Sequence, residues 1–564
     1  SKKAEAMGDA GGMGRKFWSK FKKDSLFAIY TPFVISLASG GLDSDSFRHF
    51  ISQDLYFLQA FSEAYKLAED CADDDEGRAA IHKLQKLMLD ELQNRDSMAQ
   101  EWGFELLKEK TSDNATNKYT DFVMAAASGK VEGEKLIGKI ATPFERTKLA
   151  AYALGAMAPR MRFYVYVCGE IRRLLGSDES NCLYKKWIDR YSSKEFEAMV
   201  LQTEDTLEKM SISLTGEELE VMERLYHQAV KLEVGFYSAQ RVLQRTVVPL
   251  CQPHDSGEHG VTVFCSFDVT CTGVDSSALL AEIAILTAPK AEPEPDKTQQ
   301  SLLCSDDLRS TWDRLSRQYT REHEQCIENL VSSEAEPLFN FESLCKAIEQ
   351  FFDFEKKANL RVMKSEVLKG LNLEGIKRAG QVLILHEGCR GFFQKLVNCG
   401  DWKVDVHVVS SCWCGDLIRS AFSSGGLNAV KIHSNELAYE ESVATGEIIS
   451  KVESPMEKLR VFKDTLEERQ TNDSKRLAIY IGAATSDLPC LLEADVGIVV
   501  GSSPSLRKVG DWFGVSFVPL LPGVVKKQKE ATEAGGSNWK GRSGVLYTAS
   551  SWSEVCAFMI GWRT

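Results

Sequence analysis

The spacing of apolar residues changes near residue 261, and this change limits the folds open to the chain. From about Phe17 to Gln252, apolar residues recur every three or four positions, as in FRHFISQDLYFLQAFSEAYKLAEDCA. This spacing is typical of amphipathic helices. From Val261 onward, short apolar runs appear with helical segments between them. The sequence therefore predicts an all-helical half followed by an α/β half.

The second half has the pattern of a parallel sheet covered by helices. The apolar runs that we predict as strands are VTVFCSF, QVLILH, VDVHVVS, RLAIYIG and VGIVVG. Strands that alternate with helices in one chain favour a parallel sheet with both faces covered. A helical stretch from about 307 to 378 interrupts these strands, as a cap inserted after the first strand–helix unit would.

The expected domain boundaries follow from these patterns. Residues 1–16 are small and basic, and we expect them to be the remnant of a processed leader. The helical domain is predicted over 17–252, and PHDSGEHG at 253–260 is predicted to be a linker. The α/β domain is predicted over 261–564, with its cap at about 290–378. A chain of 564 residues is long enough for several cores.

Charge and composition exclude some classes of function. The formal net charge is -13, whereas nucleic-acid binders normally show clustered excess Lys and Arg, so we expect no nucleic-acid partner. No apolar run approaches the ~20 residues that a membrane-spanning helix needs, and no membrane partner is expected. The 15 cysteines lack the paired spacing of a zinc site and indicate reduced thiols in an intracellular compartment.

Two carboxylates of the first half lie on apolar helix faces. Asp54 falls one helical turn after Phe50, and Glu233 falls two turns after Tyr226. A buried carboxylate must be paired or hydrogen-bonded, because otherwise its burial costs several kcal/mol. Two explanations stay open at this point. One is an aromatic-walled pocket for a polar ring, and the other is a structural arginine–carboxylate network with Arg160 as its cation.

Several motifs of the first half occur in the order and spacing of a known family. QDLYFLQAF, NKYTDF, APRMRFYVY, WIDRY and LEVGFY resemble the TenA family of thiaminase-II-like proteins over residues 17–245. The resemblance implies an all-helical, haem-oxygenase-like bundle whose pocket holds an aminopyrimidine derived from thiamin. By position, it implies that Asp54 binds the pyrimidine amino group and that Glu233 is the acid/base carboxylate. The residues implied to line or orient the ring are Phe57, Tyr119, Tyr164, Tyr191 and Phe236.

One position departs from the thiaminase branch of that family. A nucleophilic Cys follows the Pro of the APRMRFY segment there, but this chain has Arg160. Without that thiolate, covalent cleavage of thiamin is not expected. The lineage that lacks the Cys is associated with hydrolysis of damaged aminopyrimidines, and the resemblance then implies that Glu233 activates water. Pure ligand binding is the alternative for this half.

The stretch VFCSFDVTCTGVDSS raises a carboxylate, Asp268, at the end of an apolar strand. This position in a parallel sheet lies at the crevice where ligands bind. Asp268 is therefore a candidate nucleophile for phosphoryl transfer, which also needs cations and hydroxyls around the phosphate. Each further candidate alone has a structural explanation, such as a solvated lysine or a helix-capping Asp. These candidates, in chain order, are Ser410, Ser411, Lys458 and Asp487.

Together and in this order, these residues resemble the haloacid-dehalogenase-like hydrolases over about residues 258–564. The resemblance implies a Rossmann-like core with an inserted helical cap and an aspartyl-phosphate intermediate. It also implies Mg²⁺ as the cofactor, with Asp268 and Asp487 as its side-chain ligands. Lys458 is then a catalytic cation, and Ser410 and Ser411 bind the substrate.

Two alignments of the first motif of this superfamily stay open. In a D-x-T-x-T arrangement, which we favour, Asp268 is the nucleophile, Thr270 takes the second, catalytic position and Thr272 the substrate-binding threonine position. In a D-x-D-x-T arrangement, Ser266 stands in the place of the nucleophile and catalysis by this route should fail. The metal loop also departs from the usual pattern, because Ala483 stands where an Asp is usual.

The pairing of the two halves resembles the plant bifunctional thiamin-salvage enzymes. It implies release of phosphate from thiamin monophosphate by the second half. It also implies release of hydroxymethylpyrimidine from aminomethyl or formylaminomethyl precursors by the first. A homo-oligomer assembled through the helical half is expected, in the mitochondrion, with the cytosol as a second location. The alternative from another class is an aminopyrimidine-binding sensor or scaffold protein with a degenerate phosphatase site.

Overall fold

The computed structural model describes residues 12–103, 111–129, 143–175, 184–252, 260–289, 304–399, 404–469, 476–501, 503–535 and 539–563. It divides into two compact units. The first comprises Ser1–Leu250, Val524–Ser537 and Ala557–Thr564, and the second comprises Cys251–Gly523 and Asn538–Cys556. Residues 1–11 of the predicted leader, 253–259 of the predicted linker and 290–303 of the predicted cap lie outside the described residues.

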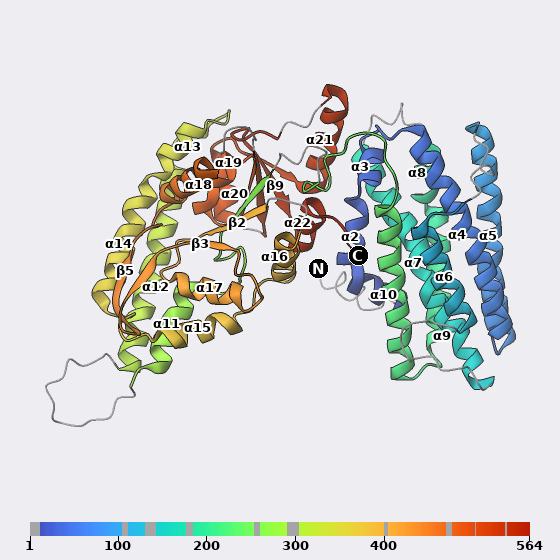
Figure 1. Cartoon of the computed structure of the whole chain (residues 1–564), viewed down its shortest axis with the longest axis horizontal. Helices are drawn as coiled ribbons and strands as arrows, with labels where there is room; N and C mark the ends of the chain where they lie inside the picture. Colours follow the sequence, from blue (N-terminus) through green and yellow to red (C-terminus); the bar gives the residue numbers. More distant parts are fainter. Residues whose placement is uncertain are drawn as a thin grey trace. The chain divides into compact units, whose positions relative to one another are not determined.

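The main body of the first unit is helical, as the apolar spacing predicted (Figure 1). Its helices are α2 (Met13–Ile29), α3 (Pro32–Ala38), α4 (Ser44–Cys71), α5 (Asp75–Glu101), α6 (Asn114–Ser128), α7 (Pro143–Leu175), α8 (Lys185–Tyr191), α9 (Lys194–Ser211) and α10 (Gly216–Ser238). Side chains fix where several of them begin. Asp43 accepts from the Ser46 amide at 2.7 Å at the start of α4, and Thr215 and Glu218 form a capping box at the start of α10.

Helix α7 lies at the centre of this bundle, because it packs against α4, α6, α8, α9 and α10. Helices α4 and α10 turn their aromatic stripes toward it, and Phe50, Phe57 and Phe236 are fully buried. Burial of such side chains stabilises each by roughly 1.5–3 kcal/mol. The polar residues that share these stripes are therefore carried into the middle of the bundle.

The second unit contains a seven-stranded parallel sheet with the order β3-β2-β1-β6-β7-β9-β8. Its strands are β1 (Val261–Cys265), β2 (Val404–Val409), β3 (Lys431–His433), β6 (Leu477–Gly482), β7 (Val496–Val500), β8 (Ser516–Pro519) and β9 (Val545–Ala549). The strand order runs one way from β1 to β3 and the other way from β6 onward. The carboxyl ends of β1 and β6 therefore flank the topological switch point, where open α/β sheets form a ligand crevice.

One predicted strand is wrong. The run QVLILH, at 381–386, forms the last two residues of α15 (Leu373–Val382) and then an irregular segment. Val382 and Ile384 are among the most exposed large apolar side chains, at 77% and 83%. Helix α15 packs instead through Ile376 and Gly380, and a Cβ at Gly380 would lie 2.6 Å from the Leu417 carbonyl of α17 (Gly415–Ser423). The apolar run was thus not a sign of burial.

Helices cover the sheet and form a cap between α11 (Ser276–Thr287) and β2. The cap contains α12 (Ser305–Leu330), α13 (Phe341–Ile348) and α14 (Gln350–Ser365), and Figure 1 shows α12 and α14 side by side. The antiparallel hairpin β4 (Glu436–Glu440) and β5 (Val443–Ile449) packs its Leu437, Ala444 and Ile448 into the same apolar cluster as α11 and α15. The other helices are α16 (Cys389–Val397), α18 (Pro455–Arg469), α19 (Leu488–Glu493), α20 (Pro504–Trp512), α21 (Leu520–Ala534) and α22 (Trp552–Met559).

Two further findings concern the helices and the cysteines of the described residues. None of their helices is both long and apolar enough to cross a membrane. Every cysteine among them is a free thiol.

Candidate active sites

The two carboxylates predicted for the first unit meet at one arginine. Asp54 of α4 and Glu233 of α10 are fully buried. Arg160 of α7 lies between them, and its Nη1 donates to both oxygens of Glu233 at 3.0 Å. Its Nη2 forms a short ion pair with Asp54. The structure therefore contains the arginine–carboxylate network that the sequence left open as one of two explanations.

A second arginine, which the sequence reasoning missed, completes this network. Arg95 of α5 pairs with Asp54 and donates from Nε to the Tyr191 hydroxyl at 2.9 Å. That hydroxyl donates to Glu91 at 2.8 Å. Glu91 and Arg95 continue the buried stripe of α5 at helical spacing after Met88. Asp54 was identified as a polar residue within an apolar helix stripe, and the same criterion would have identified Glu91 and Arg95.

Aromatic rings enclose the Arg160 guanidinium. Its central carbon lies 4.1 Å from the ring centre of Phe57 and 5.0 Å from those of Tyr164 and Phe236. The Tyr164 hydroxyl donates to Asp54 at 2.5 Å, and the Tyr119 ring packs against Phe57 with 5.0 Å between ring centres. Tyr191 contacts this network through its hydrogen bond with Arg95. All the residues predicted around the pyrimidine ring therefore lie around Arg160 or its partners. The planar group that they surround in this structure is the guanidinium.

Burial and charge act in opposite directions on the two carboxyls. Burial raises the pKa of Glu233 to about 7, although Arg160 works against that shift. Burial would also raise the pKa of Asp54, but Arg95 and Arg160 more than offset it and hold that pKa below its usual value. Glu233 is therefore the group able to exchange a proton near neutral pH. A nearby thiol, Cys168, has its pKa raised well above the usual value by burial.

In the second unit, Ser266 continues the pairing of strand β1, whereas Asp268 lies in the loop beyond it and bonds the start of α11. The Ser266 amide bonds the Ile481 carbonyl at 3.1 Å and extends the pairing of β1 with β6. The backbone then turns through Val269, whose φ of 67° lies in the left-handed region. Asp268 accepts from the Ser276 amide at 2.8 Å and the Ser276 hydroxyl at 2.7 Å, at the start of α11. Burial raises the pKa of the Asp268 carboxyl to about 6.

Asp487 is the hydrogen-bonding centre of this site. Its Oδ1 accepts from Lys458 Nζ at 3.1 Å and from the Tyr480 hydroxyl at 2.9 Å. Its Oδ2 accepts from the Ser266 hydroxyl at 2.8 Å and from the amides of Ala483 and Ala484 at 3.2 and 3.0 Å. Lys458 also donates to the Ser486 hydroxyl at 3.0 Å. The role of Ser266 here was not foreseen, since the sequence treated it only as an alternative nucleophile position.

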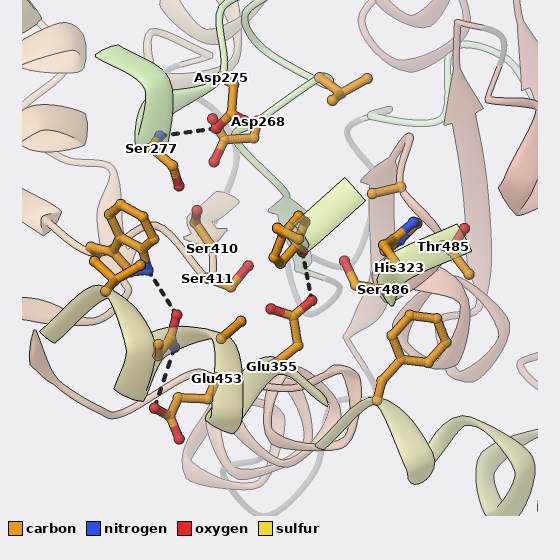
Figure 2. Close-up of a pocket in the computed structure, with 18 of the residues that line it drawn as sticks. Asp268, Asp275, Ser277, His323, Glu355, Ser410, Ser411, Glu453, Thr485 and Ser486 are labelled. Carbon is orange, nitrogen blue, oxygen red and sulfur yellow. Dashed lines mark hydrogen bonds between the residues drawn. The ribbon is translucent and has the colours of Figure 1, made fainter. Parts of the chain in front are cut away.

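A cavity of about 360 Å³ joins most of the residues predicted for phosphoryl transfer. Figure 2 shows Asp268, Ser410, Ser411 and Ser486 around it, with Glu355 facing it from the cap. The predicted residues that line it are Asp268, Ser410, Ser411, Lys458 and Asp487. Ser410 accepts from the Cys412 amide at 3.0 Å, whereas Ser411 is exposed.

Thr270 and Thr272 are buried and are not among the residues that line this cavity. Thr270 shares a hydrogen bond of 2.6 Å with the Ser266 hydroxyl. Thr272 donates to the Ile384 carbonyl at 3.3 Å and accepts from the Val274 amide at 3.1 Å. Both therefore hold the loop that carries Asp268.

The carboxylates assigned to Mg²⁺ do not form a ligand set as they stand. Both oxygens of Asp487 are occupied by hydrogen bonds from protein groups, and both oxygens of Asp268 bond Ser276. Mg²⁺ needs near-octahedral oxygen ligands at about 2.1 Å. Ala483 supplies no side-chain oxygen. Across the described part of the chain, no group of three His, Cys, Asp or Glu side chains could hold a metal ion. Because Mg²⁺ is commonly held by one or two carboxylates with water and substrate phosphate, Asp268 and Asp487 would have to give up these hydrogen bonds to ligate it.

Comparisons with known proteins found similarities to different parts of the chain. The TENA/THI-4/PQQC family model matches residues 19–132 and 144–243. The aminopyrimidine aminohydrolase of Helicobacter pylori is 27% identical over 215 residues, which cover 37% of this chain and 89% of that protein. A solved phosphoserine phosphatase, determined as a phospho-aspartyl intermediate analogue, covers 45% of this chain and 91% of its own at 15% identity and a TM-score of 0.29.

A further relative matches both units. The protein named bifunctional TH2 protein, mitochondrial, of Arabidopsis thaliana is 53% identical over 551 residues. The alignment covers 97% of this chain and 89% of that protein. Because the identity is high and extends across both units, the chain belongs to the family of bifunctional TH2 proteins.

Proposed function

We propose that the chain is a bifunctional hydrolase of thiamin salvage. Its second unit releases phosphate from thiamin monophosphate, and its first unit converts aminomethyl or formylaminomethyl pyrimidines to hydroxymethylpyrimidine. The similarity to the bifunctional TH2 protein supports two activities, and the similarity to an aminopyrimidine aminohydrolase supports the first unit's activity. The observation that carries the phosphatase proposal is the cavity that brings Asp268, Lys458 and Ser410 together at the switch point of the sheet.

In the proposed phosphatase reaction, an oxygen of Asp268 attacks phosphorus and the bond from phosphorus to the ester oxygen breaks. The departing alkoxide takes a proton from water, and a second water then attacks phosphorus, which breaks the aspartyl–phosphate bond, releases phosphate and restores the Asp268 carboxylate. Lys458 offsets phosphate charge, while Ser410 and Ser411 donate hydrogen bonds to its oxygens. Asp268 must first exchange its bonds to Ser276 for this attack.

Two substitutions separate the candidate nucleophiles of this loop. We expect Asp268→Asn to abolish phosphate release from thiamin monophosphate and Ser266→Ala to retain part of it. Trapping the phosphorylated protein gives an independent readout, because hydroxylamine cleaves an acyl phosphate but not a phosphoserine. Equal activity in wild type and Asp268→Asn, or a hydroxylamine-resistant phosphoprotein, would show that Asp268 is not the nucleophile.

Mg²⁺ stays a prediction for this unit. Asp268 and Asp487 would be its side-chain ligands, the ion would offset phosphate charge, and none of the steps above is assigned to it. Titration of metal-free protein with Mg²⁺ measures the requirement directly. Phosphate release that depends on added Mg²⁺ supports it, and full release in the presence of a chelator contradicts it.

In the proposed first-unit reaction, Glu233 acts as the general base. Its pKa of about 7 suits proton transfer at neutral pH. Glu233 takes a proton from water, the water oxygen bonds the exocyclic carbon, and the carbon–nitrogen bond breaks as the leaving nitrogen receives a proton. Asp54 would hold the ring's amino group and Phe57 would stack on the ring. The ring must then take the place that Arg160 fills in this structure.

Glu233→Gln tests whether the two activities have separate sites. We expect this variant to lose aminopyrimidine hydrolysis, because the amide cannot accept the proton, and to keep phosphate release. Loss of both activities in a folded variant would contradict independent sites.

A sensor or scaffold protein is the second candidate. It is favoured by the hydrogen-bonded state of Asp487 and by the guanidinium that fills the predicted pyrimidine place. Absence of phosphate release from wild type and from Asp268→Asn alike, together with measurable aminopyrimidine binding, would favour it. A homo-oligomer formed through the helical unit and a mitochondrial location are further proposals. Sedimentation of the full chain and imaging of the tagged protein would test them.

A further inference from the structure

The cavity of the second unit is acidic, which is unexpected for a site that receives a phosphate ester. The carboxylates that line it are Asp268, Asp275, Glu355, Glu453 and Asp487. Only two of its lining side chains are permanently cationic, Arg361 and Lys458, and burial lowers the pKa of its His323. An excess of negative charge repels a phosphate dianion unless the rest of the ligand is positively charged.

Both cations already have carboxylate partners. Arg361 pairs with Glu322 of α12, and Lys458 pairs with Asp487 at 3.1 Å. Lys458 also faces Glu355 and lowers its pKa, but its ion pair is with Asp487. The five carboxylates of the lining therefore still outnumber its two permanent cations.

Glu355 is the carboxylate of the cap that lacks a cationic partner among the described residues. It lies half-buried on α14 and accepts from the Tyr319 hydroxyl of α12 at 2.8 Å (Figure 2). Glu453 differs, because it accepts from the side chains of Asn359 and Ser450. Burial raises the pKa of Glu355 to about 7, so ionising it is costly without a positive ligand nearby.

Aromatic side chains also line the cavity. Trp312 of α12 meets Trp413 edge to face, with ring centres 6.1 Å apart. Trp413 Nε1 donates to Asn359 at 2.9 Å, which fixes the orientation of its ring. Tyr319 and Phe351 add two further rings to the lining. Aromatic faces beside a carboxylate form the surroundings that bind a flat organic cation well.

From this cavity we infer that the second unit selects phosphate monoesters whose alcohol carries a permanently cationic aromatic ring, with Glu355 as the counter-ion of that ring. Tyr319 positions Glu355, and Trp312 and Trp413 contact the ring. The phosphate is directed to Lys458 and Ser410 on the sheet side. This inference rests on the proposed phosphatase function and adds the basis of its substrate choice. Thiamin monophosphate, with its thiazolium, is an ester of this class.

The test compares two esters that differ in ring charge. The thiazolium 3,4-dimethyl-5-(2-phosphooxyethyl)thiazolium carries the charge, and 4-methyl-5-(2-phosphooxyethyl)thiazole carries the same ring without the N-methyl group and without the charge. For the full chain, we expect Glu355→Gln to lower the ratio of kcat/KM for the charged ester to that for the neutral ester by about tenfold. The matched control is Asp353→Asn, an exposed carboxylate on the same helix, which should leave this ratio within about twofold.

Binding provides a second readout that needs no turnover. Calorimetric titration of wild type and Glu355→Gln with both esters should show the same tenfold change in the ratio of Kd values. An unchanged ratio in both assays overturns the inference, as does an equal change in the Asp353→Asn control. A changed binding ratio without phosphate release from either ester keeps the cation site but refutes the phosphatase function.

Discussion

Replacing Arg160 by Met tests the buried charge network of the helical unit. Met keeps an unbranched side chain of similar length but removes the guanidinium that bonds Asp54 and both oxygens of Glu233. Loss of one partner from a buried ion pair costs about 3–5 kcal/mol. We expect the lower end of this range at pH 6. Asp54 keeps Arg95, and Glu233 is protonated there because its pKa is about 7.

The loss of unfolding free energy caused by Arg160→Met should grow above pH 7. Loss of Arg160 raises the pKa of Glu233 beyond its value of about 7 in the intact protein. The folded variant then holds a proton that the unfolded chain has already released, so its free energy of unfolding falls by about 1.4 kcal/mol per pH unit. Wild-type Glu233 is about half-protonated at pH 7 and loses the rest of its proton by about pH 8, so its own slope disappears across this range. The gap between the two proteins should therefore widen by about 2 kcal/mol from pH 7 to 8.5.

The unfolding free energy of the helical unit can be measured separately by urea titration. Pulsed hydrogen exchange on peptides from α7 and α10 then reports the unfolded fraction of that unit alone. The control is Arg162→Met, which removes an arginine of the same helix that pairs with Glu204 at 2.7 Å. The difference in unfolding free energy between wild type and Arg162→Met should not increase between pH 7 and 8.5. A loss below about 1 kcal/mol for Arg160→Met, or a gap that does not change with pH, would refute the coupling between Arg160 and Glu233.

Three further predictions concern the rest of the molecule. Asn435→Ala should destabilise the second unit by about 3 kcal/mol in urea unfolding, because the buried side chain of Asn435 bonds the backbones of Ser411, Lys451 and Val452. The preference for the cationic ester should be larger at pH 8 than at pH 6, because Glu355 gains its charge as pH rises through about 7. Titration of the phosphate affects both esters alike, so it cancels in the ratio of their kcat/KM values. The other groups that face Glu355 are Tyr319, His323, Lys458 and Glu453. No thiamin cleavage is expected, and chromatographic detection of free thiazole would contradict this.

The sequence predicted those parts of the fold that leave a strong apolar pattern. The runs that became β1, β2, β6 and β7 are continuous and largely buried, so their periodicity identified them. The run at 381–386 has the same composition, yet Val382 and Ile384 are exposed and only Leu383 of the run is buried, and composition alone cannot reveal that. Strand β8 was missed because it is short and only half-buried, and the hairpin β4–β5 was missed because its side chains alternate in burial over few residues.

Sites were harder to predict, because their geometry depends on contacts between distant segments. A stripe argument could place Asp54 inside the bundle, but it could not show that Arg95 and Arg160 both reach it from other helices. In the second unit, chain order brought Asp268 and Asp487 to one crevice. It could not show that Asp487 bonds Ser266 whereas Asp268 turns to Ser276, 8 residues further along. That choice depends on the turn at Val269, which no local pattern specifies.

The two sites use the same chemistry for a flat, positively charged group. In the helical unit, carboxylates hold the edge of the Arg160 guanidinium, and the rings of Phe57 and Phe236 lie beside it, with their centres 4.1 and 5.0 Å from its central carbon. An aminopyrimidine also presents N–H donors along one edge and an aromatic face. A ring that binds between Asp54 and Glu233 must therefore displace the guanidinium, and its affinity is reduced by the bonds that Arg160 gives up. In the second unit, Glu355 forms no ion pair among the described residues, and the Lys458 that faces it pairs with Asp487, so a ligand cation gains a partner there without breaking an ion pair of Glu355. This difference predicts tight ground-state binding at the second site and weaker binding at the first.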